Sequence, residues 1–132
     1  MLSCKSTTLR VLVVDDHELT RLTLQLAFSA QENLQVVGLA CNGQEAIEML
    51  ETCKPDVIVL DLQMPVMDGW SASSHIKAIS PQTQILAYSS VEDAKFLGAK
   101  TTFNFDEICH KDVPTNELIA LVRQLAERAG NS

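Results

Sequence analysis

The chain has 132 residues, 46% of them hydrophobic, which is enough for one domain with its own core and too short for two. Its net charge of -7 excludes the concentrated Lys and Arg that a nucleic-acid-binding surface requires, so proteins and cations are the expected partners. The sequence has no apolar run of membrane-spanning length and no signal-peptide core, which predicts a cytoplasmic protein with no membrane contact.

The cysteines are scattered singly and form no Cys-x-x-Cys pair. Neither a disulfide framework nor a zinc site is therefore expected, and the thiols should be reduced. The four positions are Cys4, Cys41, Cys53 and Cys109.

The first half of the chain alternates between strand and helix patterns. A strand is predicted over 9–14, ending on Asp15 and Asp16, and a helix over 18–29. The inner face of this helix is expected to carry the apolar residues that recur at helical spacing, with Leu24 and Phe28 widening the stripe. These recurring residues are Leu19, Leu22, Leu26 and Ala30.

A second strand is predicted over 34–40, followed by a helix that Asn42 caps. Glu45 stands three residues after Asn42, as in a capping box, and Lys54-Pro55 stops the helix.

The stretch 56–69 is the centre of the pattern. Its residues 57–60 are consecutive and mostly β-branched, which predicts a strand buried on both faces. The strand ends abruptly on Asp61, and a turn through Met64-Pro65 follows before a helix that runs from about Asp68 to Ile79.

The last third of the chain is less regular. A strand over 84–89 presents the hydroxyls of Ser89 and Ser90, and a short strand over 108–110 ends at Lys111. Between them, 92–97 suggests a short helix closed by Gly98, whereas 100–105 has no helical or strand periodicity. Pro114 suits the start of a final amphipathic helix that ends near Gly130.

This alternation predicts an α/β fold, a flavodoxin-like (βα)5 doubly wound parallel sheet with strand order 2-1-3-4-5. The domain is expected over 9–129, with an N-terminal extension at 1–8 and a C-terminal tail at 130–132. In that order the ends of the strands bring together five polar residues at one rim of the sheet. They are Asp15, Asp16, Asp61, Ser89 and Lys111.

Three neighbouring carboxylates repel one another unless their pKa values rise or a cation lies between them. Carboxylate oxygens suit Mg²⁺, so a magnesium site is predicted. With the hydroxyl of Ser89 and the ammonium of Lys111, the rim has the groups needed to receive a phosphoryl group on one of the acids.

Nearly the whole chain resembles a response-regulator receiver domain of two-component signalling, with a LuxR-type start. The resemblance rests on Val11-Leu-Val-Val-Asp-Asp-His17, on Asn42-Gly-Gln-Glu-Ala46, and on Pro55-Asp-Val-Ile-Val-Leu-Asp-Leu-Gln-Met-Pro-Val-Met-Asp-Gly69.

The resemblance implies specific roles for the rim residues. Asp61 is the phosphoacceptor, and Asp16 and Asp61 bind Mg²⁺ together with the backbone carbonyl of Gln63, while Asp15 acts largely through water. Ser89 is similar to the hydroxyl that closes onto the phosphoryl group. Lys111 resembles the lysine that pairs with that group.

The chain departs from the family's pattern before and within its last strand. Ile108 stands where the family usually has an aromatic switch residue, and Gly98-Ala99 comes several residues too early for the usual turn. An atypical surface over 98–110 is therefore expected. Because receivers generally signal in this region, the resemblance implies that this chain presents an unusual signalling surface.

The resemblance implies a histidine kinase or phosphotransfer protein as donor, and a downstream protein or an effector domain outside this chain as target. Self-association as a homodimer is left open. The chain is expected to be no enzyme beyond its own phosphorylation and dephosphorylation. No second His or Cys stands at ligand spacing from His17, His75 or His110, so surface or helix-start positions are expected for them. Ile119, beyond a single apolar face of the last helix, is the residue that could hint at dimerisation.

Three alternatives stay open at this point. The first is a degenerate receiver that binds a partner without phosphorylation. The second is a phosphohydrolase of the haloacid-dehalogenase type, although that chemistry requires an acid where Gln63 stands. The third is a flavodoxin, whose flavin phosphate the acidic turn at Asp15-Asp16 would repel.

Overall fold

The computed structural model describes residues 8–90 and 104–130. In chain order the elements are β1 (Leu9–Val14), α1 (Glu18–Ser29), β2 (Leu34–Ala40), α2 (Gly43–Cys53), β3 (Val57–Asp61), α3 (Gly69–Ile79), β4 (Gln84–Ser89), β5 (Glu107–His110) and α5 (Thr115–Gly130). Within the described ranges, no helix is both long enough and apolar enough to cross a membrane.

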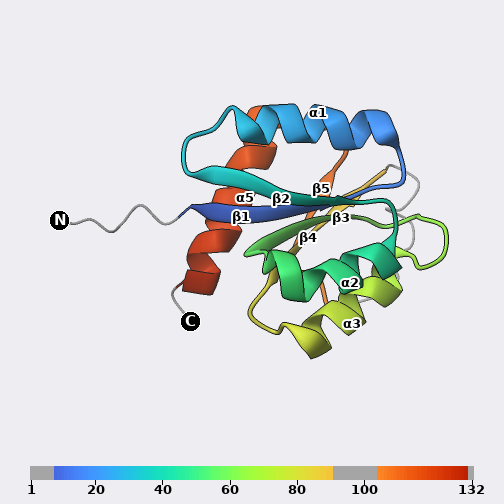
Figure 1. Cartoon of the computed structure of the whole chain (residues 1–132). Coiled ribbons are helices and arrows are strands. Elements are labelled where there is room, and N and C mark those ends of the chain that lie inside the picture. The colour runs from blue at the N-terminus through green and yellow to red at the C-terminus, as the bar shows by residue number, and fades with distance from the viewer. Residues whose placement is uncertain (1–7, 91–103, 131–132) are drawn as a thin grey trace.

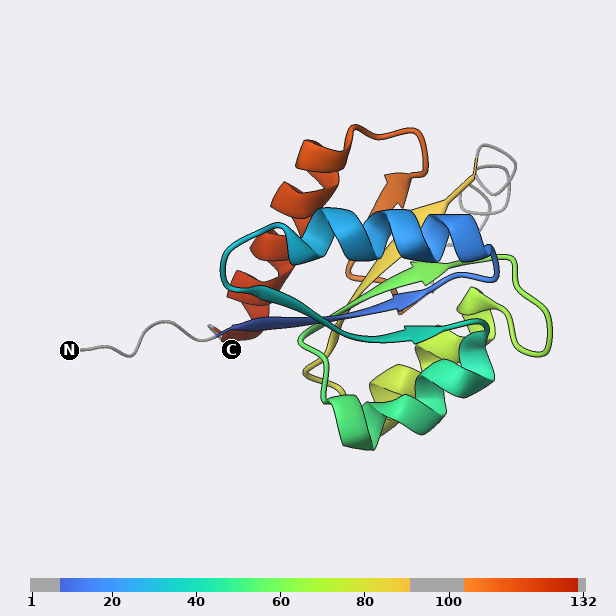
Figure 2. The ribbon, with the colours of Figure 1, turned by 45° about the horizontal axis from the view of Figure 1, so that its top comes forward.

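The five strands form one parallel sheet in the order β2-β1-β3-β4-β5, which confirms the predicted topology. Helices α1 and α5 cover one face, and α2 and α3 cover the other (Figure 1). Turning the molecule brings the strands into view between these two helical layers (Figure 2). The carboxyl ends of all five strands therefore lie at one rim of the sheet.

The central strands are buried on both faces, as their uninterrupted apolar sequences predict. Side chains from alternate positions of β1 and β3 point to opposite sides. Val11 and Val59 join the core under α1 and α5, whereas Leu12 and Ile58 join the core over α2 and α3. All five residues of β3, including the terminal Asp61, are buried.

Side-chain caps begin two of the helices. The Asn42 side chain accepts a hydrogen bond from the backbone N–H of Glu45 at 2.9 Å, and the Glu45 carboxylate accepts one from the N–H of Cys41 at 2.7 Å. At the start of α3, the Asp68 carboxylate accepts from the N–H of Ser71 at 2.8 Å. Both helices that follow the acidic rim on this face are thus fixed at their first turn.

The predicted inner face of α1 is wrong. Leu19, Leu22 and Leu26 are 77%, 45% and 74% exposed, whereas Leu24 and Phe28 are buried against the sheet. Two apolar stripes at helical spacing run along this helix, and periodicity alone cannot tell which of them packs on the strands. The outer stripe leaves an apolar surface on α1.

The structure also revises the reading of the last third of the chain. The expected helix over 92–97 lies outside the described residues, as does most of the irregular stretch over 100–105. Ile119 is only 9% exposed and packs in the core under α1 and α5, so it is no sign of a dimer surface. Ile108 is 45% exposed on β5, the strand at one edge of the sheet.

Candidate metal and phosphoryl site at the carboxyl rim

The site begins with two carboxylates at the ends of neighbouring strands. Because Val14 of β1 pairs with Leu60 of β3, the residues that follow them, Asp15 and Asp61, come side by side. Asp15 is 1% exposed and Asp61 is 3% exposed. Two buried carboxylates that lie side by side repel each other, so they need a positive charge nearby to balance them.

Lys111, immediately after β5, supplies one positive charge. Its Nζ donates to Asp15 Oδ2 at 2.9 Å and lies 3.1 Å from Asp61 Oδ1. Burial lowers the pKa of Lys111, but the hydrogen bond to Asp15 and the charge of Asp61 outweigh burial and raise the pKa overall. The lysine therefore stays charged between the two acids.

One oxygen of Asp61 is left over. Oδ2 is buried and has no hydrogen-bond partner. Burial, followed by repulsion from Asp15, raises the pKa of Asp61 to about 6, although Lys111 acts in the opposite direction. A buried, unpaired carboxylate oxygen has a strong requirement for a cation or another bonding partner.

Asp16 and His17 complete the cluster from the loop after β1. The ring nitrogen Nδ1 of His17 lies 3.0 Å from Asp15 Oδ1 and 3.1 Å from Asp16 Oδ1. One ligand atom from each of Asp15, Asp16, His17 and Asp61 lies within 4.8 Å of the others. Such a mixed set of oxygen and nitrogen donors can hold a divalent metal ion.

The structure brings His17 into this cluster, although sequence reasoning set it aside. It lies at the surface and at a helix start, as expected, but its ring also faces the two acids. The sequence argument asked only for a second His or Cys at ligand spacing. It therefore did not consider carboxylates as the further ligands. The sequence contained one usable signal, since His17 directly follows two acids at a strand end.

The two remaining predicted site residues are Ser89 and Gln63. Ser89 is fully buried at the end of β4, and its hydroxyl donates to the Cys109 carbonyl of β5 at 3.4 Å. Its own carbonyl accepts the backbone N–H of Lys111 at 2.7 Å. Gln63 lies on the exposed loop two residues after Asp61, and its role as a carbonyl ligand stays a prediction.

Two further residues support the site and were missed from the sequence. Arg21 of α1 donates from Nη1 to the carbonyl oxygen of Asp15 at 2.7 Å, which fixes the backbone that carries this carboxylate. The ammonium of Lys111 lies 5.7 Å from the centroid of the Tyr88 ring, within the range of a cation–π contact. Arg21 lies six residues after Asp15 and Lys111 lies 23 residues after Tyr88, and neither contact follows from a local sequence pattern.

The loop after β3 is tightly constrained. Gly69 donates its N–H to the carbonyl of Leu62 at 2.9 Å, and a Cβ at Gly69 would collide with the carbonyl oxygen of Asp61. Val66 has φ of 69°, and the N–H of Met67 bonds the carbonyl of Pro65 at 2.7 Å, which makes Val66 the centre of a γ-turn. A β-branched residue in this conformation stores strain beside the site.

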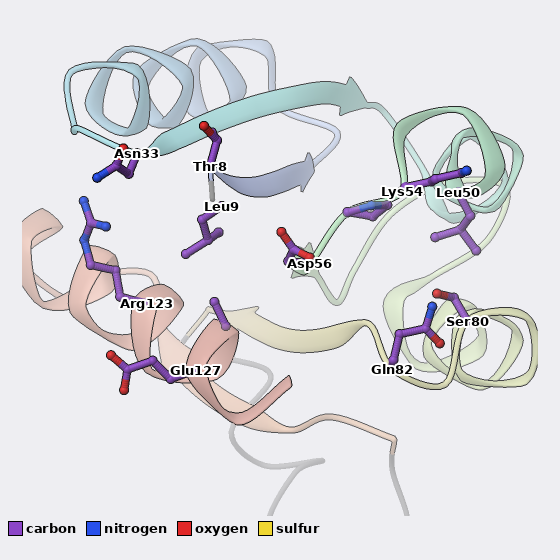
Figure 3. A pocket seen from close by; sticks show the side chains of 12 residues that line it. Thr8, Leu9, Asn33, Leu50, Lys54, Asp56, Ser80, Gln82, Arg123 and Glu127 are labelled. Atoms are coloured by element: carbon purple, nitrogen blue, oxygen red, sulfur yellow. The ribbon is translucent and has the colours of Figure 1, made fainter. Parts of the chain in front are cut away.

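A pocket lies at the opposite end of the sheet. Its volume is about 860 Å³, and it is lined by the starts of the strands and by the last turns of α5 (Figure 3). Asp56, one of its lining residues, accepts the N–H of Arg10 at 2.9 Å, and the Arg10 side chain in turn donates to the carbonyl of Cys53 at 2.6 Å. Asp56 therefore has a hydrogen-bond donor at its carboxylate, unlike the unpaired Oδ2 of Asp61.

The family model for the response regulator receiver domain matches residues 11–123. The chain belongs to this family. It is 42% identical over 97 residues to the protein-glutamate methylesterase/protein-glutamine glutaminase 2 of Photobacterium profundum, a match that covers 74% of this chain and 24% of that relative. It is also 34% identical over 117 residues to the response regulator VraR of Staphylococcus aureus, covering 89% of this chain and 56% of VraR.

Among solved structures, the response regulator domain of CheB from Thermotoga maritima is similar to this receiver. The TM-score is 0.77 at 29% identity, with 91% of this chain and 97% of that one covered. The receiver spans about a quarter of the methylesterase relative and about half of VraR.

The predictions of the family, the fold and a role in two-component signalling are confirmed, and the reading as a degenerate binding module is not favoured. The match supports a signalling role for this receiver region. Receivers of this family generally bind Mg²⁺ in an acidic pocket, and the cluster at Asp15, Asp16 and Asp61 is an acidic pocket of that kind. The domain limits 9–129 stay a prediction.

Proposed function

We propose that Asp61 accepts a phosphoryl group from a phosphohistidine of a partner kinase or phosphotransfer protein. The observation that carries this proposal is the buried Asp61 carboxylate, which has one oxygen held by Lys111 and the other without a partner. Lys111 fixes the direction of a carboxylate that burial has removed from water, which prepares one of its oxygens to attack and the other to bind an ion.

The transfer needs no protein acid or base at Asp61. A carboxylate oxygen of Asp61 attacks phosphorus, the N–P bond of the donor breaks, and the donor imidazole leaves with the electron pair and takes up a proton. The product is an acyl phosphate on Asp61. Lys111, which already lies 3.1 Å from this carboxylate, neutralises the oxygens of the incoming group.

Asp15, Asp16, Asp61 and the backbone carbonyl of Gln63 would hold Mg²⁺ in this proposal. The unpaired Oδ2 of Asp61 supports the fit, because a buried oxygen without a hydrogen bond is the natural ligand of a hard cation. When bound, the ion supplies positive charge that neutralises the phosphoryl oxygens and lowers the repulsion between the acids.

Ser89 and β5 would transmit the event. The Ser89 hydroxyl now donates to the Cys109 carbonyl, and turning toward a phosphoryl group on Asp61 would break that 3.4 Å bond. The backbone bond from Lys111 to Ser89 links the same movement to β5. The exposed Ile108 then belongs to the surface that a downstream protein or an effector domain would recognise.

The outer leucines of α1 would receive the donor protein. Leu19 stands only three residues beyond Asp16, so a partner that delivers a phosphohistidine to Asp61 has to approach this end of α1. A Leu19→Ser, Leu22→Ser variant is expected to accept phosphate from a phosphorylated kinase more slowly, while its reaction with acetyl phosphate is unchanged. An unchanged rate from the kinase would argue against this surface.

The main test uses the intact mass of the protein after incubation with acetyl phosphate. With Mg²⁺ the protein should gain the mass of one phosphoryl group, and both chelation of divalent ions and the Asp61→Asn substitution should prevent the gain. Equal incorporation in wild type and Asp61→Asn, or none in folded wild type with saturating Mg²⁺, would overturn the proposal.

A further inference from the structure

We propose that His17 is a protein ligand of the ion at this rim, and that the site therefore accepts a divalent first-row transition ion such as Mn²⁺ through mixed oxygen and nitrogen donors. The inference deepens the proposed function, because it rests on the same acidic site and assigns to it a nitrogen ligand and a class of metal.

The geometry of the ring supports a ligand role. His17 Nδ1 lies 3.0 Å from Asp15 Oδ1 and 3.1 Å from Asp16 Oδ1. Adjacent ligands of an octahedral ion with bonds of about 2.1 Å are separated by roughly 3.0 Å. The nitrogen and the two oxygens thus already stand at the spacing that neighbouring ligands of one ion require.

A divalent cation would contact more of these ligand atoms than a proton on His17 Nδ1 does. Lys111 is paired with Asp15 and Asp61, and the buried Oδ2 of Asp61 has no hydrogen-bond partner in the cluster. A proton on Nδ1 reaches Asp15 and Asp16 but leaves that oxygen unpaired. A divalent ion can contact the carboxylates and the ring nitrogen together, since all four ligand atoms lie within 4.8 Å.

The orientation of the ring suits a ligand. The His17 side chain is 65% exposed while its Nδ1 faces Asp15 and Asp16, so the ring can present Nδ1 to an ion and Nε2 to water.

The position has no evident helix-capping role. His17 occupies the N-cap of α1, yet its side chain makes no capping hydrogen bond. A side chain that served the helix would accept a bond from the first turn. The ring points instead to Asp15 and Asp16.

A nitrogen donor changes which divalent ions a metal site prefers. Oxygen-only sites suit Mg²⁺, whereas imidazole strengthens binding of Mn²⁺, Co²⁺, Ni²⁺ and Zn²⁺. We therefore expect the wild-type protein to bind Mn²⁺ more tightly than Mg²⁺. The imidazole of His17 should account for the part of this preference that is due to a nitrogen ligand.

The experiment compares wild type with His17→Asn. Asparagine is a favoured N-cap and keeps a polar amide near the acids, so the helix start is preserved while the imidazole is removed. His75→Asn is the matched control, because His75 is an exposed histidine of α3 outside the cluster. Pulsed electron paramagnetic resonance of bound Mn²⁺ reports directly on a coordinated imidazole nitrogen, and calorimetry gives the affinities for Mn²⁺ and Mg²⁺.

The expected result is a nitrogen signal in wild type and His75→Asn that is lost in His17→Asn. The affinity for Mn²⁺ should fall about tenfold in His17→Asn, while that for Mg²⁺ changes less than about twofold. No imidazole nitrogen on Mn²⁺ in wild type, or an equal fall for both ions, would overturn the inference. Failure of folded wild type to bind either ion would instead count against the metal site in the proposed function.

Discussion

The two ends of the sheet differ in what they leave unpaired. At the amino end, a pocket of about 860 Å³ is lined by polar groups that include the paired Asp56. At the carboxyl end, Asp15 and Asp61 are almost fully buried, and one oxygen of Asp61 has no hydrogen bond. The unbalanced buried charge of Asp15 and Asp61 marks the site in this receiver.

The difference follows from how the chain enters and leaves each strand. Asp56 precedes β3 and accepts the Arg10 N–H, whereas Asp61 ends β3 beside a second carboxylate. β3 therefore has Asp56 before its first residue and Asp61 as its last. Only Asp61 lies in an environment that favours phosphoryl transfer.

The largest expected effect is the difference in phosphorylation between substitution of Asp61 and substitution of Asp56. Asp61→Asn should abolish phosphorylation by acetyl phosphate, because an amide cannot form the acyl phosphate. Asp56→Asn is the matched control on the same strand and should retain the wild-type rate. Both are measured by intact mass over time. A rate lost in both variants would mean that the two ends are not independent.

Substitution of Gly69 should disturb the carboxyl end through its backbone. Gly69→Ala places a methyl group against the Asp61 carbonyl, which we expect to cost about 2 kcal/mol in the free energy of unfolding and to slow phosphorylation. In Gly38→Ala, the methyl group meets mainly the flexible end of Met49, so a smaller loss is expected. Urea unfolding measures both, and an equal cost would contradict the tight approach at Gly69.

The pH dependence of stability should differ between wild type and Asp61→Asn. Burial and Asp15 raise the pKa of Asp61 from 3.8 to about 6 in the folded state, so the folded protein binds the proton more tightly than the unfolded chain. Without divalent ions, this group's contribution is therefore most favourable at low pH and is lost as pH rises from about 4 to about 6.

We expect Asp61→Asn to gain about 2 kcal/mol relative to wild type across that window, with little further change above it. Unfolding by urea at several pH values, with a chelator present, gives the difference. A constant difference between pH 4 and pH 7 would contradict the raised pKa.

The smallest effect is expected at the amino-end pocket. Gln82→Ala with Glu127→Ala removes two exposed side chains that line it, and should change stability by less than about 0.5 kcal/mol. Phosphorylation should be unaffected. A clear fall in the phosphorylation rate would show that the amino-end pocket takes part in function, which would contradict the difference drawn between the two ends.

The sequence predicts the part of the site that depends on strand ends. Asp15 and Asp61 follow apolar runs, and once the strand order is known they have to meet. The caps at Asn42 and Asp68 are local patterns, and they begin helices where expected. These features follow from short-range rules applied to one topology.

The rest depends on contacts between distant residues. Leu24 and Leu26 lie on different sides of α1, and only packing on the sheet decides that the first is buried. The contact of Lys111 with the Tyr88 ring and the approach of Gly69 to the Asp61 carbonyl are likewise set by tertiary structure. The position of the His17 ring beside Asp15 and Asp16 likewise depends on the folded loop after β1.

The most direct test of the central claim is to locate the phosphoryl group. Borohydride reduces an aspartyl phosphate to homoserine, so treatment of the phosphorylated protein followed by peptide mass spectrometry identifies the residue that carried it. We predict homoserine at position 61, formed only when the phosphodonor and Mg²⁺ are both present. Phosphate found on Ser89, Ser90 or a histidine, with position 61 unmodified, would contradict the account.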